Sequence, residues 1–245
     1  MIPVIKPAFT GIVLVMSVAS SFAQDARKIA FRTLCPERVK GIESVVIPGV
    51  AADVQKIELY TDVSPVVDGV FKTGEADFFI EKPPGPDGKP VRELVGKAAL
   101  GKSDHQLFLF TPGGSSEGKL PYSVRAFDDD TRIFPMGSVR VINLSPVPVR
   151  FLLSGEMTPQ IPPAKYAQFP HSKKVNDFNM YPVVVQFLSA TGEWINGQSV
   201  SWKATDRRRD IVVTSVDPRF KQPAVSMYSD FPPWMAAART PPKAK

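Results

Sequence analysis

The chain has 245 residues and a formal net charge of +6 at pH 7, from 30 Lys and Arg against 24 Asp and Glu. So modest a charge favours loose contact with anionic surfaces, and the sequence predicts no nucleic-acid partner. The chain has 25 prolines, which exclude long helices, and a single cysteine, which excludes an internal disulfide. We expect that cysteine, Cys35, to be a buried thiol without chemical function, the alternative being a reactive or intermolecular one.

The first 23 residues have the pattern of a cleavable signal peptide. Lys6 is their only charged residue, an apolar stretch covers residues 8–19, and the small residues Ser21 and Ala23 stand just before the expected cut. The apolar stretch is shorter than the roughly 20 residues of a membrane-spanning helix, although an uncleaved anchor or a buried helix is the alternative. The sequence therefore predicts export to the periplasm or beyond the cell, with no stable membrane insertion after cleavage.

Runs rich in β-branched and aromatic residues recur between turn signals along the rest of the chain. Alternation of apolar and polar residues is clearest in 122–127 and 138–141, where Arg125 and Arg140 are expected to point to solvent. Short runs at this spacing predict an all-β protein of antiparallel, immunoglobulin-like sandwich lobes. The predicted strands are 29–34, 56–60, 76–80, 106–111, 122–127, 138–144, 147–153, 181–189, 200–203 and 211–216.

Turn-forming residues separate the predicted strands. Residues 82–90 are too rich in proline and glycine for regular structure and are expected to form an exposed turn. Three consecutive acids, Asp128, Asp129 and Asp130, follow a predicted strand and mark the expected boundary between two β lobes. The sequence thus predicts a signal peptide (1–23), a first β lobe (24–127), a second β-sandwich lobe (128–218) and a flexible Pro-rich tail (219–245).

One string, at residues 114–118, matches the G-x-S-x-G of a nucleophile elbow. That motif holds its serine on a strained turn between a strand and a helix, and here Pro121 argues against the helix. We therefore expect a flexible glycine–serine loop in which Ser116 is not a nucleophile.

The residues that could bind a metal ion are few and far apart. His105 and His171 are the only histidines, 66 residues apart, and one distant cysteine does not complete a zinc site. A copper site in a β-sandwich needs two His, a Cys and usually a Met, but Cys35 lies far before both histidines. Residues 128–130 lack the spaced acids of an EF-hand loop and are expected to form an acidic surface turn. The sequence therefore assigns no catalytic, cofactor-binding or metal-ligating residue, and no cofactor.

The densest basic point is the run of three arginines at 207–209, which could meet a phosphate group or an acidic polymer. Asp206 and Asp210 flank the run and partly cancel its field. We expect it to be a solvated turn that leads into the strand beginning near Ile211.

The segment from Met136 to Val149 reads MGSVRVINLSPVPV. It resembles the opening strands of the β-rich repeats of unknown function in exported bacterial proteins of the DUF4397 type. In that family a strand of the form V-R-V-x-x-x-S-P precedes a second strand after the proline. The segment is also similar to the R-V-x-N strand of immunoglobulin-like pilus chaperones. The resemblance covers about 14 of 245 residues. It implies an exported bacterial envelope protein with sandwich lobes, and it carries over no catalytic residue.

The sequence as a whole favours a non-enzymatic exported protein that binds or assembles with another envelope or extracellular protein or polymer. Two alternatives stay open. A secreted hydrolase whose active site follows no motif would be favoured by a deep pocket that holds His171 or paired carboxylates. An immunoglobulin-like periplasmic chaperone would be favoured by an exposed apolar strand edge.

Overall fold

The computed structural model describes residues 26–48, 54–71, 74–86, 88–113, 118–217, 219–220 and 222–234. This part of the chain is all β, with sixteen strands and no α-helix, so the all-β part of the predicted fold class is confirmed. None of its segments is a helix long and apolar enough to cross a membrane. The predicted signal peptide, Ser116 and the last eleven residues of the expected tail lie outside the described residues.

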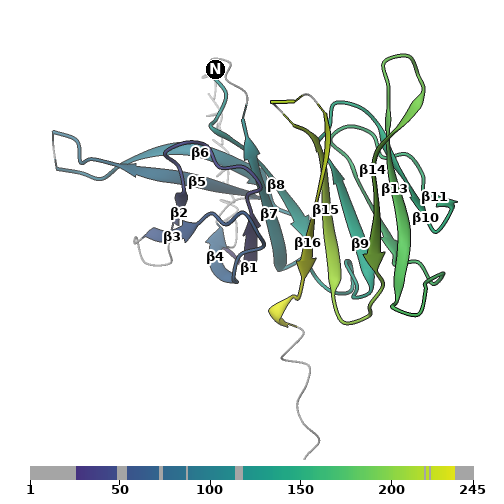
Figure 1. Ribbon diagram of the computed structural model, residues 1–245. Helices are drawn as coiled ribbons and strands as arrows, with labels where there is room; N and C mark the ends of the chain where they lie inside the picture. Colours follow the sequence, from purple (N-terminus) through teal and green to yellow (C-terminus); the bar gives the residue numbers. More distant parts are fainter. Residues whose placement is uncertain are drawn as a thin grey trace, which may run out of the picture.

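The first eight strands form two four-stranded sheets that enclose a common core (Figure 1). One sheet has the strand order β4-β1-β7-β8 and the other β3-β2-β5-β6. Phe31, Phe78 and Phe108 pack edge to face in this core, an arrangement that aromatic rings prefer. The strands of this first lobe are β1 (Arg27–Leu34), β2 (Ser44–Pro48), β3 (Val54–Glu58), β4 (Val67–Phe71), β5 (Glu75–Lys82), β6 (Val91–Ala99), β7 (His105–Pro112) and β8 (Tyr122–Asp128).

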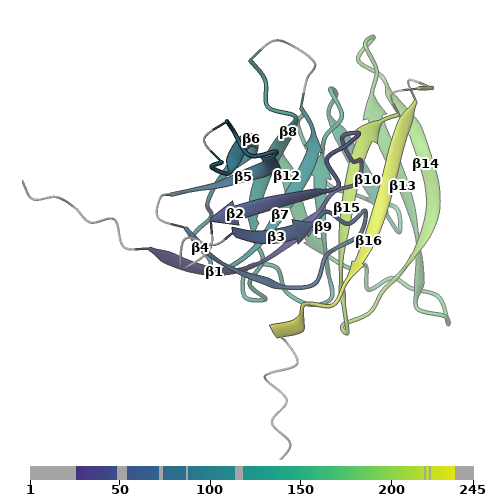
Figure 2. The ribbon, with the colours of Figure 1, turned by 90° about the vertical axis from the view of Figure 1, so that its left-hand side faces the viewer.

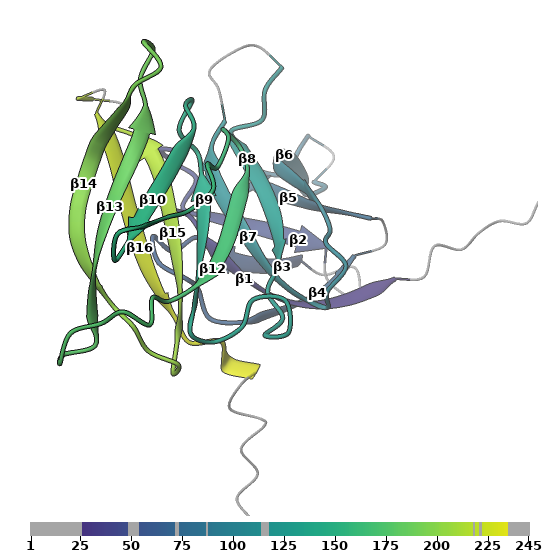
Figure 3. The same cartoon turned by 90° about the vertical axis from the view of Figure 1, so that its right-hand side faces the viewer.

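The next eight strands form a second pair of sheets, with the orders β12-β9-β15-β16 and β11-β10-β13-β14. Phe151, Tyr181 and Trp202 lie in the core between them. Figure 3 shows β10, β13 and β14 on the side of the molecule away from the first lobe. The strands of this second lobe are β9 (Ser138–Asn143), β10 (Val149–Leu153), β11 (Glu156–Met157), β12 (Tyr166–Pro170), β13 (Met180–Leu188), β14 (Trp194–Lys203), β15 (Arg209–Val216) and β16 (Pro223–Asp230).

The second lobe repeats the topology of the first, strand for strand. Adding eight to each strand label of the first lobe gives the two sheet orders of the second. In both lobes the first and seventh strands run parallel, β1 with β7 and β9 with β15. The registers align Arg32 with Leu107 and Arg140 with Ile211, so these pairs occupy corresponding positions. The described chain is therefore a structural duplication of one eight-stranded unit.

The two lobes meet through corresponding sheets, β4-β1-β7-β8 from the first and β12-β9-β15-β16 from the second, with a third apolar core between them. In Figure 2, β1, β2 and β3 run across the direction of β13, β14 and β16, as in orthogonal packing of β-sheets. The sheets thus form four layers with three cores. The third core contains Leu34, Leu107, Leu109, Phe127, Phe134, Ile142, Ile211 and Val213.

Two arginines and two aspartates are buried beside this third core. Arg32 donates to Asp129, with Nη2 2.6 Å from Oδ2, and to Asp230, with Nη1 2.5 Å from Oδ1. Arg209 donates to the same two carboxylates, and no side chain of the four is more than 3% exposed. Burial raises the pKa of Asp230, but the hydrogen bonds and charges of Arg32 and Arg209 outweigh burial and hold that pKa below its ordinary value. Each aspartate pairs with both Arg32 of the first lobe and Arg209 of the second, so this ion-pair quartet joins the lobes.

Aromatic rings cover the buried arginines. The guanidinium carbon of Arg32 lies 4.9 Å from the centroid of the Trp234 ring. The ring of Phe134 lies between two buried guanidinium groups. Its centroid is 4.2 Å from the guanidinium carbon of Arg140 and 4.4 Å from that of Arg209. A desolvated cation over an aromatic ring gains about 2 kcal/mol. Phe134 and Trp234 each follow the last strand of their own lobe, so both lobes close the interface in a similar way.

The packing of one lobe on the other overturns three predictions made from local sequence. Arg140, expected to point to solvent, is 1% exposed because the first lobe covers the outer face of β9. Asp129, expected in an acidic surface turn, and Arg209, expected in a solvated turn, are fully buried in the ion-pair quartet. Alternation along a strand predicts two faces, but it does not reveal that a second sheet covers the polar one.

The prediction that residues 219–245 form a flexible tail is also partly wrong. Residues 223–230 form β16, which pairs along its whole length with β15. The sequence likewise did not predict β2, β4, β6, β11 and β12.

Candidate functional site

His171 directly follows β12, and its backbone N–H donates to the carbonyl of Gly137 at 3.0 Å. Its side chain is only 5% exposed. Nδ1 lies 2.9 Å from the hydroxyl of Tyr181, and Nε2 lies 3.4 Å from Oδ2 of Asp210. A chain of three polar side chains, Tyr181–His171–Asp210, therefore links the core of the second lobe to the start of β15.

Burial determines the charge states along this chain. It raises the pKa of Tyr181 above its ordinary value, so the phenol keeps its proton. The neutral imidazole that carries its proton on Nε2, toward the Asp210 carboxylate, accepts at Nδ1 from the Tyr181 hydroxyl, and the other tautomer reverses the direction of that hydrogen bond. Burial also lowers the pKa of His171, with Asp210 opposing this shift and Arg208 adding to it. Arg208, whose Nε lies 3.1 Å from Oδ1 of Asp210, balances the buried carboxylate.

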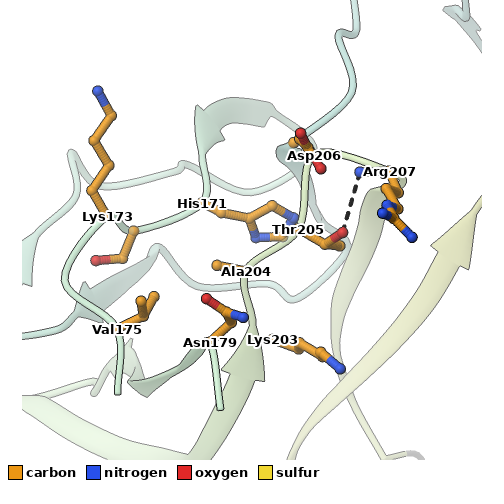
Figure 4. A pocket seen from close by; sticks show the side chains of 11 residues that line it. His171, Lys173, Val175, Asn179, Lys203, Ala204, Thr205, Asp206 and Arg207 are labelled. Atoms are coloured by element: carbon orange, nitrogen blue, oxygen red, sulfur yellow. Dashed lines mark hydrogen bonds between the residues drawn. The ribbon is translucent and has the colours of Figure 1, made fainter. Parts of the chain in front are cut away.

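An open hollow of about 760 Å³ lies over His171 (Figure 4). In this view Lys173 lies on one side of the imidazole, and Lys203 and Arg207 lie on the other. None of these three cations has an ion-pair partner within the described part of the chain. One acid, Asp206, lines the same hollow, so its side chains carry a net positive charge. The other lining residues are Gly137, Ser172, Val175, Asn179, Ala204 and Thr205.

The hollow forms where the second lobe departs most from the first. Nine residues, 171–179, connect β12 to β13, whereas three, 72–74, connect the corresponding strands β4 and β5. Of the seven connections between successive strands, this is the one that is longer in the second lobe. Asn176 orders the loop, because its Oδ1 accepts hydrogen bonds from the backbone N–H groups of Phe178 and Met180, both at 3.0 Å. The duplicated scaffold therefore carries an elaborated loop on one copy.

The other histidine lies at a separate place. The ring of His105 stacks on Trp234 with centroids 4.4 Å apart, and its Nδ1 lies 3.9 Å from Oδ2 of Asp130. Cys35 is fully buried, as the sequence predicts, and burial raises the pKa of its thiol. Within the described residues, no group of three or more His, Cys, Asp and Glu could hold a metal ion.

Ser116 lies outside the described residues, so its surroundings do not bear on its predicted lack of reactivity. The description resumes at residue 118, and residues 118–121 lead directly into β8. The helix that completes a nucleophile elbow is replaced here by a strand.

Comparison of the chain with models of known protein families gives no match, and comparison with curated proteins gives none. The segment 136–149, which carries the resemblance to exported β-rich repeats, forms β9, the turn after it and the first residue of β10.

We expect the stability of the protein to fall as the pH drops through the ordinary histidine pKa, about 6.5. Because the pKa of His171 is lower in the folded chain, the unfolded chain takes up the proton first. The stabilising contribution of neutral His171 is therefore complete above the unfolded pKa and is lost as the pH falls toward the lower folded value. Urea unfolding of the wild type and of His171→Gln at about pH 7.5 and pH 5.5 measures this contribution.

The pKa of Asp210 is raised in the folded chain, so this carboxyl makes the protein more stable as the pH falls, opposite to His171. The difference between the pH profiles of the wild type and of His171→Gln therefore measures the contribution of the histidine better than either profile alone. His105→Gln, which replaces the other histidine, is the matched control for the loss of an imidazole. Identical pH profiles for the wild type and His171→Gln would contradict this assignment.

Proposed function

We propose that this chain is a non-enzymatic exported protein that binds an anionic group of an envelope or extracellular partner, a protein or a polymer, in the hollow over His171. The observation that carries the proposal is the group of three cations, Lys173, Lys203 and Arg207, around that hollow without ion-pair partners among the described residues. A concave surface with charges of one sign focuses their field and raises the local concentration of the opposite ion. The signal-peptide pattern of the first 23 residues supports export.

Carboxylate, phosphate and sulfate oxygens are the groups that suit this hollow. The ammonium groups of Lys173 and Lys203 are mobile point donors, whereas Arg207 offers a planar fork that matches two oxygens at once. Below the rim, Arg208 and Asp210 balance each other, and His171 is neutral at pH 7 because burial lowers its pKa. Lys173, Lys203 and Arg207 therefore make the electrostatic potential in the hollow positive.

A secreted hydrolase is the second candidate, because a hollow with a buried histidine and a carboxylate at its base is the feature that favours it. A general base needs a ring nitrogen free to take a proton from the substrate. In His171, Nδ1 is hydrogen-bonded to Tyr181, whereas Nε2 makes no hydrogen bond and is buried from solvent 3.4 Å from Oδ2 of Asp210, so neither nitrogen is open to a substrate. Labelling by a fluorophosphonate probe that disappears in Ser116→Ala would reverse the order of the two candidates.

The chaperone alternative has less support. Its mode of binding needs an apolar edge strand to which a partner adds a strand. Two edge strands expose polar and charged side chains, Gln55 and Lys56 on β3 and Arg92 and Glu93 on β6. Other edge strands expose single large apolar or aromatic side chains between polar ones, namely Met157, Tyr166, Ile195 and Met227. Charges on an edge strand oppose the addition of another strand.

We expect residues 24–245 to bind inorganic phosphate and sulfate in calorimetric titrations at low ionic strength. Lys203→Ala and Arg207→Ala should each weaken binding about tenfold, because a hydrogen bond to a charged group is worth about 1.5 kcal/mol or more. Asp206→Asn should strengthen it by removing the one acid of the hollow. Lys28→Ala, which removes an exposed lysine of the first lobe, is the matched control. Affinities that do not differ among these variants would refute the proposal.

A further inference from the structure

A second hollow, of about 400 Å³, lies beside the first in the second lobe. Its lining contains four apolar side chains, Leu153, Met157, Phe169 and Pro170. Met157 is 49% exposed, and moving its apolar side chain out of water is favourable. The hollow therefore offers apolar surface beside the ion pair of Lys174 and Glu156, whose Nζ and Oε1 lie 2.7 Å apart.

The two hollows share a wall. His171, Ser172 and Lys173 line both of them. Ser172 holds this wall in place, since its Oγ accepts from the N–H of Lys174 at 3.1 Å and lies 2.9 Å from Oγ of Ser154. A ligand that crosses the wall would place one end among cations and the other among apolar side chains.

We infer that the ligand of this site is an amphiphilic anion, in which a carboxylate, phosphate or sulfate is joined to an alkyl chain. The inference rests on the proposed function, because it assigns the anionic end to the hollow over His171. The second hollow has room for roughly ten methylene groups, if each takes about the 30 Å³ of a water molecule. Covering Met157 and Phe169 with such a chain removes apolar surface of both partners from water.

Exposed apolar side chains lie on the same loop as one of the cations. Phe178 is 78% exposed and Val175 is 38% exposed, both within the loop 171–179 that carries Lys173. An amphiphilic anion can reach the site as a free molecule or as a lipid of an anionic bilayer. A bilayer would also take up an exposed aromatic ring on a loop that carries lysines, whereas a free amphiphile would leave Phe178 in water.

The experiment is a calorimetric titration of residues 24–245 with inorganic phosphate and with ethyl, butyl, hexyl and octyl phosphate, each below its micelle concentration. We expect the association constant to rise about two- to fourfold for each added methylene. Met157→Asn should abolish this rise and leave the affinity for inorganic phosphate unchanged. Ile195→Asn, an equally exposed apolar position on β14, is the matched control and should keep the rise.

The possible outcomes separate the inference from the proposed function. Binding of phosphate without any gain from the alkyl chain overturns the inference alone, and so does a gain that survives Met157→Asn. No binding of phosphate or of any alkyl phosphate overturns both. Given the gain, co-sedimentation with phosphatidylglycerol but not phosphatidylcholine vesicles, lost in Phe178→Ala, identifies a bilayer lipid as the source. The gain without vesicle binding identifies a free amphiphile.

Discussion

Replacing Arg209 by alanine is expected to destabilise the folded chain by about 3–5 kcal/mol. The guanidinium donates to the carboxylates of Asp129 and Asp230, and also to the carbonyls of Asp129 and Phe134 at 3.0 and 2.8 Å. Its removal leaves two buried carboxylates with Arg32 as their remaining partner, and two carbonyls without this donor. The cost is large because the groups left behind stay out of water.

Urea unfolding followed by tryptophan fluorescence measures this loss. Arg132→Ala is the matched control, since Arg132 also pairs with an aspartate, Asp130 at 2.8 Å, but its side chain is 88% exposed. Exposed pairs contribute at most about 1 kcal/mol, so this variant should unfold almost as the wild type does. A loss below about 1 kcal/mol for Arg209→Ala would indicate that water reaches the quartet.

The second large effect is expected in the apolar core between the lobes. Leu107 and Ile211 occupy corresponding positions on β7 and β15, and both are fully buried there. Leu107→Ala and Ile211→Ala should each cost about 2–5 kcal/mol, through lost burial and the cavity that is left. The same loss from either side is what a duplicated interface predicts. Ile195→Ala, at a position 49% exposed, is the control and should cost much less.

Unfolding should also proceed in a single transition, because the third core and the ion-pair quartet couple the two lobes. Two separate transitions, or a loss below about 1 kcal/mol from both core variants, would show that the lobes fold as independent units. Calorimetry on residues 24–245 distinguishes these cases.

The strands with strong patterns are predictable from sequence, and five of the six strands that the sequence did not predict lie at sheet edges. β7, β13 and β15 contain the apolar runs LFLF, VVV and IVV, and two neighbouring strands flank each of them in its sheet. The strands β12 and β16 lie at the two edges of one sheet and have mixed compositions, YAQFP and PAVSMYSD. With one partner and partial exposure, such strands need less β propensity, so composition alone did not reveal them.

The duplication was hidden for a related reason. Corresponding positions share a role but not a residue type: Leu107 corresponds to Ile211, and His105 to Arg209. Asp129 and Asp230 are an exception, since each lies opposite the first residue of the seventh strand of its lobe. The shared topology makes corresponding side chains point in the same direction. A side chain at such a position needs only a suitable size and polarity, so its residue type can differ between the lobes.

The candidate site could not be predicted because its members are brought together by strand order. In the sheet order β12-β9-β15, the strand β9 lies between the other two. His171 follows β12 and bonds to Gly137 just before β9, while Asp210 on β15 aligns with Val139 of β9. The sequence offered one partial signal, the acids that flank the arginines at 207–209. It could not indicate that Arg207 faces the hollow while Arg209 is buried.

A crystal structure of residues 24–245 with octyl phosphate tests most directly whether the hollow over His171 is a binding site. We predict the phosphate within hydrogen-bonding distance, about 2.7–3.2 Å, of the side-chain nitrogens of Lys203 and Arg207. The alkyl chain should cross the wall at Ser172 and lie against Met157. Octyl phosphate bound elsewhere on the protein, or an empty hollow in crystals grown at saturating ligand, would contradict the proposed site.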